Sequence, residues 1–358
     1  MLLKNYGAMT SILSSNIFPT KILIIQFKYL GDAVILTPAL QALRNKFPQS
    51  QIHLLVPMEC ASIFKHLTIV DNIVGLPRKR GSINFFRLWP YIQKLRNKQF
   101  DMSIDFAGND RGALLSFLIN AKKRFANADR PPTFFQKIGY TDIFYRDAIS
   151  SSWIMKHLYF LNKALNVSII IKPKLIVVPE LQLALDAKNI LKKHDIICHI
   201  GTSQPKKEWH LLYWLELYKT AKKNGYNLAF SSGINKREQN LLKQLKKMDP
   251  DIFTLPKIRN LSLFIAILNQ AKIVISCDTA PLHIASGLGV KVIALYAVED
   301  GVKNYSKIYS EDDLVMGSKC KCVGSLSHFS LCQNNSYCMN SITVKSVYNS
   351  LVRKYRKH

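Results

Sequence analysis

The chain has 358 residues, 48% of them hydrophobic, which is enough for two globular domains with cores of their own. Fifty Lys and Arg residues against 23 Asp and Glu give a formal net charge of +27, which favours nucleic acid, an anionic membrane surface or a phosphorylated substrate as partner. No apolar run approaches the ~18 residues of a membrane span, and the first residues lack the features of a signal peptide.

The two ends of the chain add little to this picture. Residues 1–20 are expected to be an N-terminal extension, with Met9 as an alternative start, and we expect a cytoplasmic protein. Reduced thiols follow from that location. Four of the seven cysteines cluster near the end of the chain, and their spacing does not match paired zinc ligands, so we expect no metal there. They are Cys320, Cys322, Cys332 and Cys338.

Strand-like and helix-like segments alternate in the first half, which predicts α/β architecture with a parallel sheet. The expected strands are residues 21–27, 51–56 and 101–106, and the expected helices are residues 38–46 and 85–98. Two prolines flank an extended segment at residues 172–179, where we place an interdomain linker.

A second alternating series follows the linker. Its predicted strands are residues 196–200 and 226–230, and its predicted helices are residues 211–224, 236–247, 261–270 and 342–355. We therefore expect two Rossmann-like doubly wound domains, residues 21–175 and 176–340, followed by a C-terminal helix at residues 341–358. Ligands are expected in the cleft between them, at the carboxyl ends of the strands.

The segment at residues 272–296 is the most informative of the chain. Residues 273–277 and 291–296 read as buried strands, with a short helix between them that Asp278 or Thr279 can cap. Such a turn places free backbone N–H groups at the carboxyl edge of a sheet, where phosphates bind, and His283 could add a donor. The segment predicts a nucleotide diphosphate site.

Two other turns could contribute chemistry. In the turn at residues 27–34, Gly31 permits a sharp exit from the strand, and Asp32 could be a general base or a helix cap. This turn alone favours the cap. The loop at residues 201–209 offers Thr202, Ser203 and Lys207, which would suit phosphate binding, and Lys207 could neutralise a leaving diphosphate.

The pattern LGD-x₅-P at residues 30–38 and the run DTAPLHIASGLGV at residues 278–290 occur in the order typical of one enzyme family. With the segments at residues 100–126, 205–218 and 232–242, the chain resembles glycosyltransferase family 9, the bacterial ADP-heptose:lipopolysaccharide heptosyltransferases, over nearly its whole length after residue 20. The LGD segment and the DRGALL segment at residues 110–115 look closest to the third-heptosyltransferase branch.

This resemblance implies a GT-B fold and an inverting transfer of heptose from ADP-heptose, without an obligatory metal or other cofactor. Asp32 matches the catalytic base. Thr202, Ser203 and Lys207 match positions that hold the donor phosphates, and Asp278, Thr279 and His283 match the nucleotide-sugar turn. The family glycine after the Asp-Thr pair is Ala280 here, and a frequent acidic position is Asn235.

For the acceptor, the resemblance implies phosphorylated inner-core lipopolysaccharide, bound by a protein peripheral to the inner leaflet of the inner membrane. The basic candidates for acceptor binding are Lys28, Arg78, Lys79, Arg80 and Arg111. The aromatic run at residues 83–92 could contact the membrane or belong to the core.

Three alternatives stay open at this point. The enzyme could use another ADP- or UDP-activated sugar, since Ala280 and Asn235 depart from the family pattern. It could be a basic nucleic-acid-binding protein, for which charge alone speaks. It could also be a non-catalytic family member that binds nucleotide sugar, although the joint presence of Asp32, Lys207, Asp278 and His283 argues against that.

Overall fold

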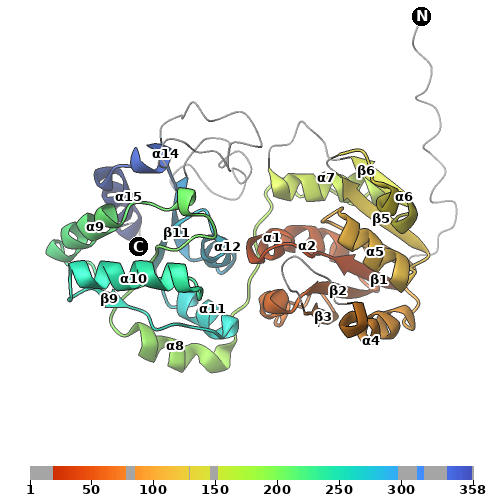
Figure 1. Cartoon of the computed structure of the whole chain (residues 1–358), viewed down its shortest axis with the longest axis horizontal. Coiled ribbons are helices and arrows are strands. Elements are labelled where there is room, and N and C mark those ends of the chain that lie inside the picture. The colour runs from red at the N-terminus through yellow and green to blue at the C-terminus, as the bar shows by residue number, and fades with distance from the viewer. Residues whose placement is uncertain are drawn as a thin grey trace, which may run out of the picture.

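The computed structural model describes residues 19–77, 85–128, 130–145, 152–296, 313–317 and 337–356. Two α/β domains lie side by side in it, each built on a six-stranded parallel sheet (Figure 1). Arg78, Lys79, Arg80, Cys320, Cys322 and Cys332 lie outside the described residues, as do nearly all of residues 1–20. Among the described residues, no helix is both long and apolar enough to cross a membrane.

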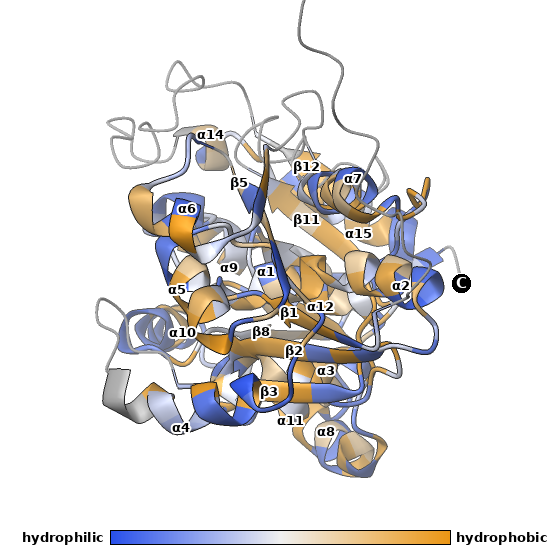
Figure 2. Ribbon diagram, turned by 90° about the vertical axis from the view of Figure 1, so that its right-hand side faces the viewer, coloured by the Kyte–Doolittle hydropathy of each residue, from blue (hydrophilic) through white to orange (hydrophobic). Residues whose placement is uncertain are grey.

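The first sheet has the strand order β3-β2-β1-β4-β5-β6, so its winding direction reverses between β1 and β4. Its strands are β1 (Lys21–Ile25), β2 (Gln51–Pro57), β3 (Asn72–Leu76), β4 (Met102–Asp105), β5 (Lys123–Ala128) and β6 (Asp142–Tyr145). The central strands are mostly orange in Figure 2, because both of their faces are covered.

Side chains of β1 alternate between two cores. Ile22 and Ile24 join the core formed with α1 (Leu30–Ile35), α2 (Thr37–Lys46), α3 (Ala61–Phe64) and α7 (Trp153–Leu165). Leu23 and Ile25 face α4 (Phe85–Arg96) and α5 (Asp110–Ile119). The short α6 (Phe134–Gly139) packs on α5, and η1 (Met58–Cys60) follows β2.

The second sheet, β12-β11-β10-β7-β8-β9, repeats the winding of the first, with its reversal between β7 and β10. Its strands are β7 (Ile196–His199), β8 (Leu228–Ser231), β9 (Phe253–Thr254), β10 (Ile273–Cys277), β11 (Lys291–Tyr296) and β12 (Leu314–Met316). The expected pair of Rossmann-like doubly wound domains is confirmed.

Helices cover both faces of this sheet. One face carries α8 (Ala184–Leu191), α11 (Leu261–Asn269) and α12 (Ala280–Gly287), and the other carries α9 (Leu211–Lys223), α10 (Lys236–Met248) and α15 (Val344–Arg356). The remaining helical turns are η2 (Leu181–Leu183), η3 (Pro205–Lys207) and α14 (Tyr337–Asn340). The C-terminal helix α15 buries Val347 and Leu351 in the core beside α9.

The two domains share one hydrophobic core. Buried side chains of α1 and α2 belong to the same cluster as those of α11 and α12, and α1 packs against α12. The crossing chain reinforces this contact, because the Ile176 N–H donates to Thr37 Oγ1 at 3.0 Å and the Val177 N–H donates to the Gly287 carbonyl at 3.0 Å. The turns that follow β1 and β10 are thereby brought face to face.

Candidate active site

The second sheet presents its two predicted phosphate-binding turns at its switch point. Lys207 lies in the loop after β7 and Asp278 in the turn after β10, and these strands are neighbours. Lys207 Nζ lies 2.5 Å from Asp278 Oδ2, with 25% and 17% of the two side chains exposed. Loops at such a switch point form the ligand crevice of doubly wound sheets. The fold thus joins residues that stand 71 positions apart.

Helix α12 starts directly at this ion pair. Thr279 is its N-cap residue and Ala280 its first helical residue, so the backbone N–H groups that open the helix lie beside Lys207 and Asp278. Ala280 does not have a positive φ. The position therefore needs no glycine, and the alanine leaves the backbone donors in place.

His283 lies in the same helix and is almost fully buried. Its Nε2 lies 3.9 Å from Asp278 Oδ1. Burial lowers the pKa of His283 to about 4, and the Lys207 charge adds to this, against the opposing effect of Asp278. The imidazole is neutral at neutral pH, which leaves Lys207 as the cation of this cluster.

The loop after β7 is held from within and from α10. The Thr202 hydroxyl donates to the Gln204 carbonyl at 2.6 Å and is buried, whereas Ser203 is exposed. Arg237 of α10 binds Glu208 Oε1 at 2.5 Å and also donates to the Thr202 carbonyl. Thr202 thus shapes the loop, while Ser203 and Lys207 are better placed to meet a ligand.

Glu238 contacts both the loop after β7 and the loop after β8. Its Oε2 accepts the Gly233 N–H at 3.0 Å, and a β-carbon on Gly201 would lie only 2.3 Å from the same oxygen. Burial raises the pKa of Glu238. Asn235 caps α10 by accepting the Glu238 N–H at 2.9 Å, so its side chain serves the local fold.

In the first domain, helix α1 faces α12, and we call this side of the site the Asp32 wall. Asp32 occupies the first turn of α1, where its Oδ2 accepts the Tyr29 N–H at 3.1 Å. The capping interaction expected from the sequence is therefore present. A β-carbon on Gly31 would lie 3.2 Å from Cδ2 of His283 and 3.9 Å from the Ala280 Cα. The residue before Asp32 thus lies against the start of α12 in the other domain.

Two of the acceptor candidates, Lys28 and Arg111, lie within the described residues. Like Asp32, they follow the carboxyl ends of the neighbouring strands β1 and β4. The Lys28 ammonium lies 4.9 Å from the centre of the Trp153 ring, and the Arg111 guanidinium lies 5.9 Å from that of Phe27. Such cation–π contacts keep the charge at the surface of the wall.

Sequence reasoning missed Asp105, which ends β4 at the switch point of the first sheet. It is fully buried, and Oδ2 accepts the Tyr140 hydroxyl at 2.5 Å while Oδ1 accepts the Ala107 N–H at 2.7 Å. Burial raises the pKa of Asp105, against the lowering effect of these hydrogen bonds. An aspartate at the end of a strand whose residues are mostly buried could have drawn attention to this position.

The loop after β7 ends at Trp209, whose Nε1 donates to the Ile342 carbonyl at 2.9 Å. The side chain of Cys338 is buried. Within the described ranges, no three His, Cys, Asp or Glu side chains gather as metal ligands would.

Residues 88–332 match the model of glycosyltransferase family 9 (heptosyltransferase). The chain belongs to this family. It is therefore a glycosyltransferase, and the alternative of a nucleic-acid-binding protein is not favoured.

Individual relatives agree with this assignment. The transferase is 23% identical to the lipopolysaccharide core heptosyltransferase OpsX of Haemophilus influenzae, over 80% of this chain and 81% of that protein. It is 20% identical to lipopolysaccharide heptosyltransferase 3 of Escherichia coli, over 77% and 83%. The structure of E. coli ADP-heptose lipopolysaccharide heptosyltransferase II superposes with a TM-score of 0.74 at 14% identity, over 94% and 99%. The fold is GT-B, as expected.

Proposed function

We propose that this transferase moves heptose from ADP-heptose to the inner core of lipopolysaccharide with inversion at the anomeric carbon. The carrying observation is the contact of α1 with α12, which sets the Asp32 turn against the turn that holds Asp278 and His283. Family membership and relatives that are themselves named lipopolysaccharide heptosyltransferases support the donor and the acceptor.

The donor diphosphate would bind to Lys207 and to the N–H groups at the start of α12. Lys207 is paired with Asp278 at 2.5 Å, so the phosphates must share or displace that carboxylate. Thr279 and Ala280 supply the adjoining backbone, and Ser203 lies exposed in the facing loop. Because Lys207 and the helix N-terminus already provide positive charge, we propose that no metal is obligatory.

In the reaction, Asp32 would take the proton of an acceptor hydroxyl. That oxygen then bonds to the anomeric carbon of heptose, while the bond from this carbon to the β-phosphate oxygen breaks. ADP leaves with its new charge facing Lys207. The hydrogen bond from Tyr29 N–H fixes the Asp32 carboxylate for this step.

The acceptor would approach from the Asp32 wall. Lys28 and Arg111 give this wall the positive charge that a phosphorylated core requires. An acceptor anchored in the inner leaflet implies an enzyme of the cytoplasm that binds the inner membrane peripherally. We propose the branch that decorates an existing core heptose, because the LGD and DRGALL segments resemble it, and heptosyltransferase 3 is one of several heptosyltransferases among the relatives.

The test is release of ADP from ADP-heptose in the presence of core-truncated lipopolysaccharide, with UDP-glucose as comparison donor. We expect Asp32→Ala and Asp32→Asn to lower kcat by at least about 10²-fold, as loss of a general base does, while ADP still binds. Asp186→Asn, an exposed first-turn carboxylate of α8, is the matched control. Full turnover in the Asp32 variants would remove this residue from the mechanism. A preference for UDP-glucose would contradict ADP-heptose as the donor.

A further inference from the structure

A cavity of about 710 Å³ lies at the amino edge of the second sheet, far from the phosphate loop. It opens between α15 and the turn that leads into β8, and its lining residues are Asn224, Tyr226, Tyr348, Asn349, Val352, Arg353 and Arg356. No carboxylate is among these residues. The sugar transfer proposed above makes no use of this pocket.

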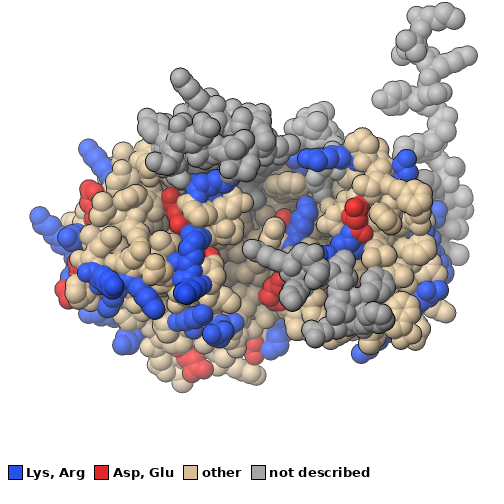
Figure 3. Space-filling model, viewed as in Figure 1, with Lys and Arg blue, Asp and Glu red and all other residues tan. Residues whose placement is uncertain are grey.

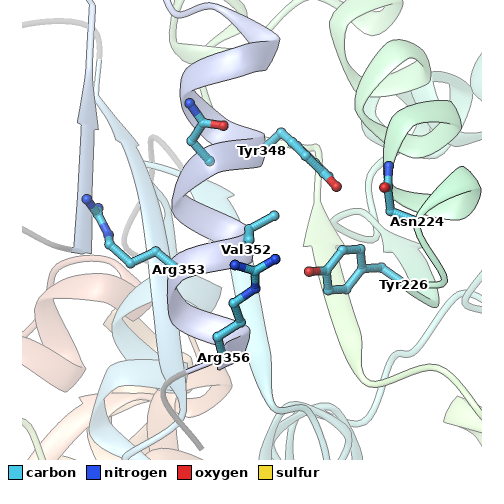
Figure 4. Close-up of a pocket in the computed structure, with 7 residues that line it drawn as sticks. Asn224, Tyr226, Tyr348, Val352, Arg353 and Arg356 are labelled. Atoms are coloured by element: carbon cyan, nitrogen blue, oxygen red, sulfur yellow. The ribbon is translucent and has the colours of Figure 1, made fainter.

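The lining groups converge from two elements. Figure 4 shows Arg356 and the hydroxyls of Tyr226 and Tyr348 directed into the space between α15 and the opposite turn, with Asn224 beyond them. The rings of Tyr226 and Tyr348 are 6.2 Å apart at their centres and nearly perpendicular. Guanidinium and phenol groups donate hydrogen bonds to phosphate oxygens, while asparagine amides and ring faces suit sugar hydroxyls and C–H groups.

Two carboxylates of neighbouring elements, Asp195 and Asp251, are already engaged. Asp195, just before β7, accepts the Tyr355 hydroxyl at 2.6 Å and pairs with Lys272 at 3.0 Å. Asp251 pairs with Lys222 at 2.9 Å. Among the described residues, Arg356 forms no ion pair, and it is exposed. An anion that enters the pocket therefore meets an uncompensated guanidinium.

The surroundings reinforce this positive charge. Lys223 adjoins Asn224 at the end of α9 and is exposed, as is Lys247 on α10. Figure 3 shows Lys and Arg side chains gathered on the part of the molecule that α9 and α10 form. A basic surface of this kind raises the local concentration of anions.

We propose that this pocket is a second anion site, which binds the phosphate monoester of a phosphorylated sugar or of a lipid headgroup. Arg356 holds the phosphate, Tyr226 and Tyr348 donate to it, and Asn224 contacts the attached hydroxyl groups. Because the pocket lies at the opposite edge of the sheet from Lys207, binding there leaves the donor site open.

The experiment uses the full chain with saturating ADP, which occupies the donor site. Calorimetry measures binding of glucose 6-phosphate, with glucose as the uncharged comparison, to wild type, Arg356→Gln and the control Lys137→Gln, which removes one exposed charge from α6 of the other domain. We expect Arg356→Gln to weaken the affinity about tenfold, as loss of a charged hydrogen bond does, and the control to match wild type.

A second arm identifies the source of the phosphate. Vesicles of phosphatidylcholine with and without phosphatidic acid are sedimented with the same three proteins. Loss of phosphatidic-acid binding in Arg356→Gln, but not in the control, assigns a lipid headgroup, whereas an effect on glucose 6-phosphate alone assigns a soluble or saccharide phosphate. If Arg356→Gln equals wild type in both arms, the proposal is overturned. ADP release from ADP-heptose should be unchanged in Arg356→Gln, so the result does not depend on the proposed transfer.

Discussion

Lys207 and Asp278 form an ion pair at 2.5 Å, and both side chains are only partly exposed to water. The pair keeps the proposed donor site near neutrality, because burying one of these charges alone would cost more. A diphosphate carries enough negative charge to compete with Asp278 for the ammonium. A neutral sugar does not, so this pair favours charged donors.

Replacement of Lys207 by Gln tests that role. We expect kcat/KM for ADP-heptose to fall on the order of 10²-fold, since the variant loses the cation that faces the leaving phosphate. Steady-state ADP release measures this change. Lys219→Gln, an exposed lysine of α9, should retain wild-type values; an equal loss in both variants would point to overall charge instead of the site.

Unlike the change at Lys207, replacement of Ala280 by Gly should leave ADP binding almost unchanged. Because this residue does not have a positive φ, glycine should bring no conformational benefit. We expect Ala280→Gly to bind ADP within about threefold of wild type and to unfold at a slightly lower temperature, as a glycine in a helix does. A large gain in ADP affinity, measured by calorimetry, would show that the alanine obstructs the donor.

At the scale of elements, Gly112 allows α5 to lie against the end of β4. A β-carbon there would lie 1.7 Å from Asp105 Oδ2 and 3.0 Å from the Tyr140 hydroxyl. The helix, the aspartate and the tyrosine must therefore occupy one close-packed site. Arg111, next to Gly112, depends on this packing for its position over Phe27.

We accordingly expect Gly112→Ala to lower the free energy of unfolding by about 1–3 kcal/mol, as overpacking of a buried site does. Urea denaturation followed by circular dichroism measures the change. Ser116→Ala, in the same helix, removes a buried hydroxyl without a partner and should be close to neutral. If the alanine at 112 is tolerated equally well, the packing at Asp105 is looser than described.

Sequence patterns predicted most of the central strands but missed the long, largely buried helix α7 and the strands β3, β5 and β6. The expected strands at residues 273–277 and 291–296 coincide with β10 and β11. They did not predict β9 and β12, which have two and three residues and exist because a neighbouring strand offers hydrogen bonds. The expected strand at residues 21–27 ends at Ile25, and α1 forms as a separate short helix before α2.

For the candidate site, too, local features could be predicted and long-range ones could not. Asp32, Lys207 and Asp278 could be selected from the sequence, because the residues that form a turn are adjacent in the chain. The Arg237–Glu208 pair and the Asp105–Tyr140 pair could not, since their members stand 29 and 35 positions apart and meet only after folding. Which residues face one another across the cleft also depends on the contact of α1 with α12.

For the whole molecule, three buried histidines set a dependence of stability on pH. Burial lowers the pKa of His53, His199 and His283 from 6.5 to about 4 in the folded state. Above pH 6.5 these groups are neutral in both states and do not affect stability. As pH falls from 6.5 towards 4, these histidines become protonated in the unfolded chain but stay neutral in the folded protein. The free energy of unfolding therefore decreases.

We therefore expect Tm to fall steadily between pH 6.5 and about 4 in calorimetric scans. His53→Leu should flatten this fall, because His53 packs edge-on against Phe100 and neither of its ring nitrogens has a hydrogen-bond partner. Ser116→Ala, at a buried polar group that does not titrate in this range, is the comparison and should leave the slope near that of wild type. Identical slopes in all three proteins would contradict the assignment.

The hydrogen bond from Trp209 Nε1 to the Ile342 carbonyl connects the end of the phosphate loop with the segment that leads into α15. Under the proposed function, this segment supports donor binding although it contributes no residue to the site itself. Shortening the protein from its C-terminus would loosen the loop that carries Lys207 before it exposed any residue of the cleft itself. Fusion partners or truncations at that end should accordingly be judged by the affinity for ADP as well as by solubility.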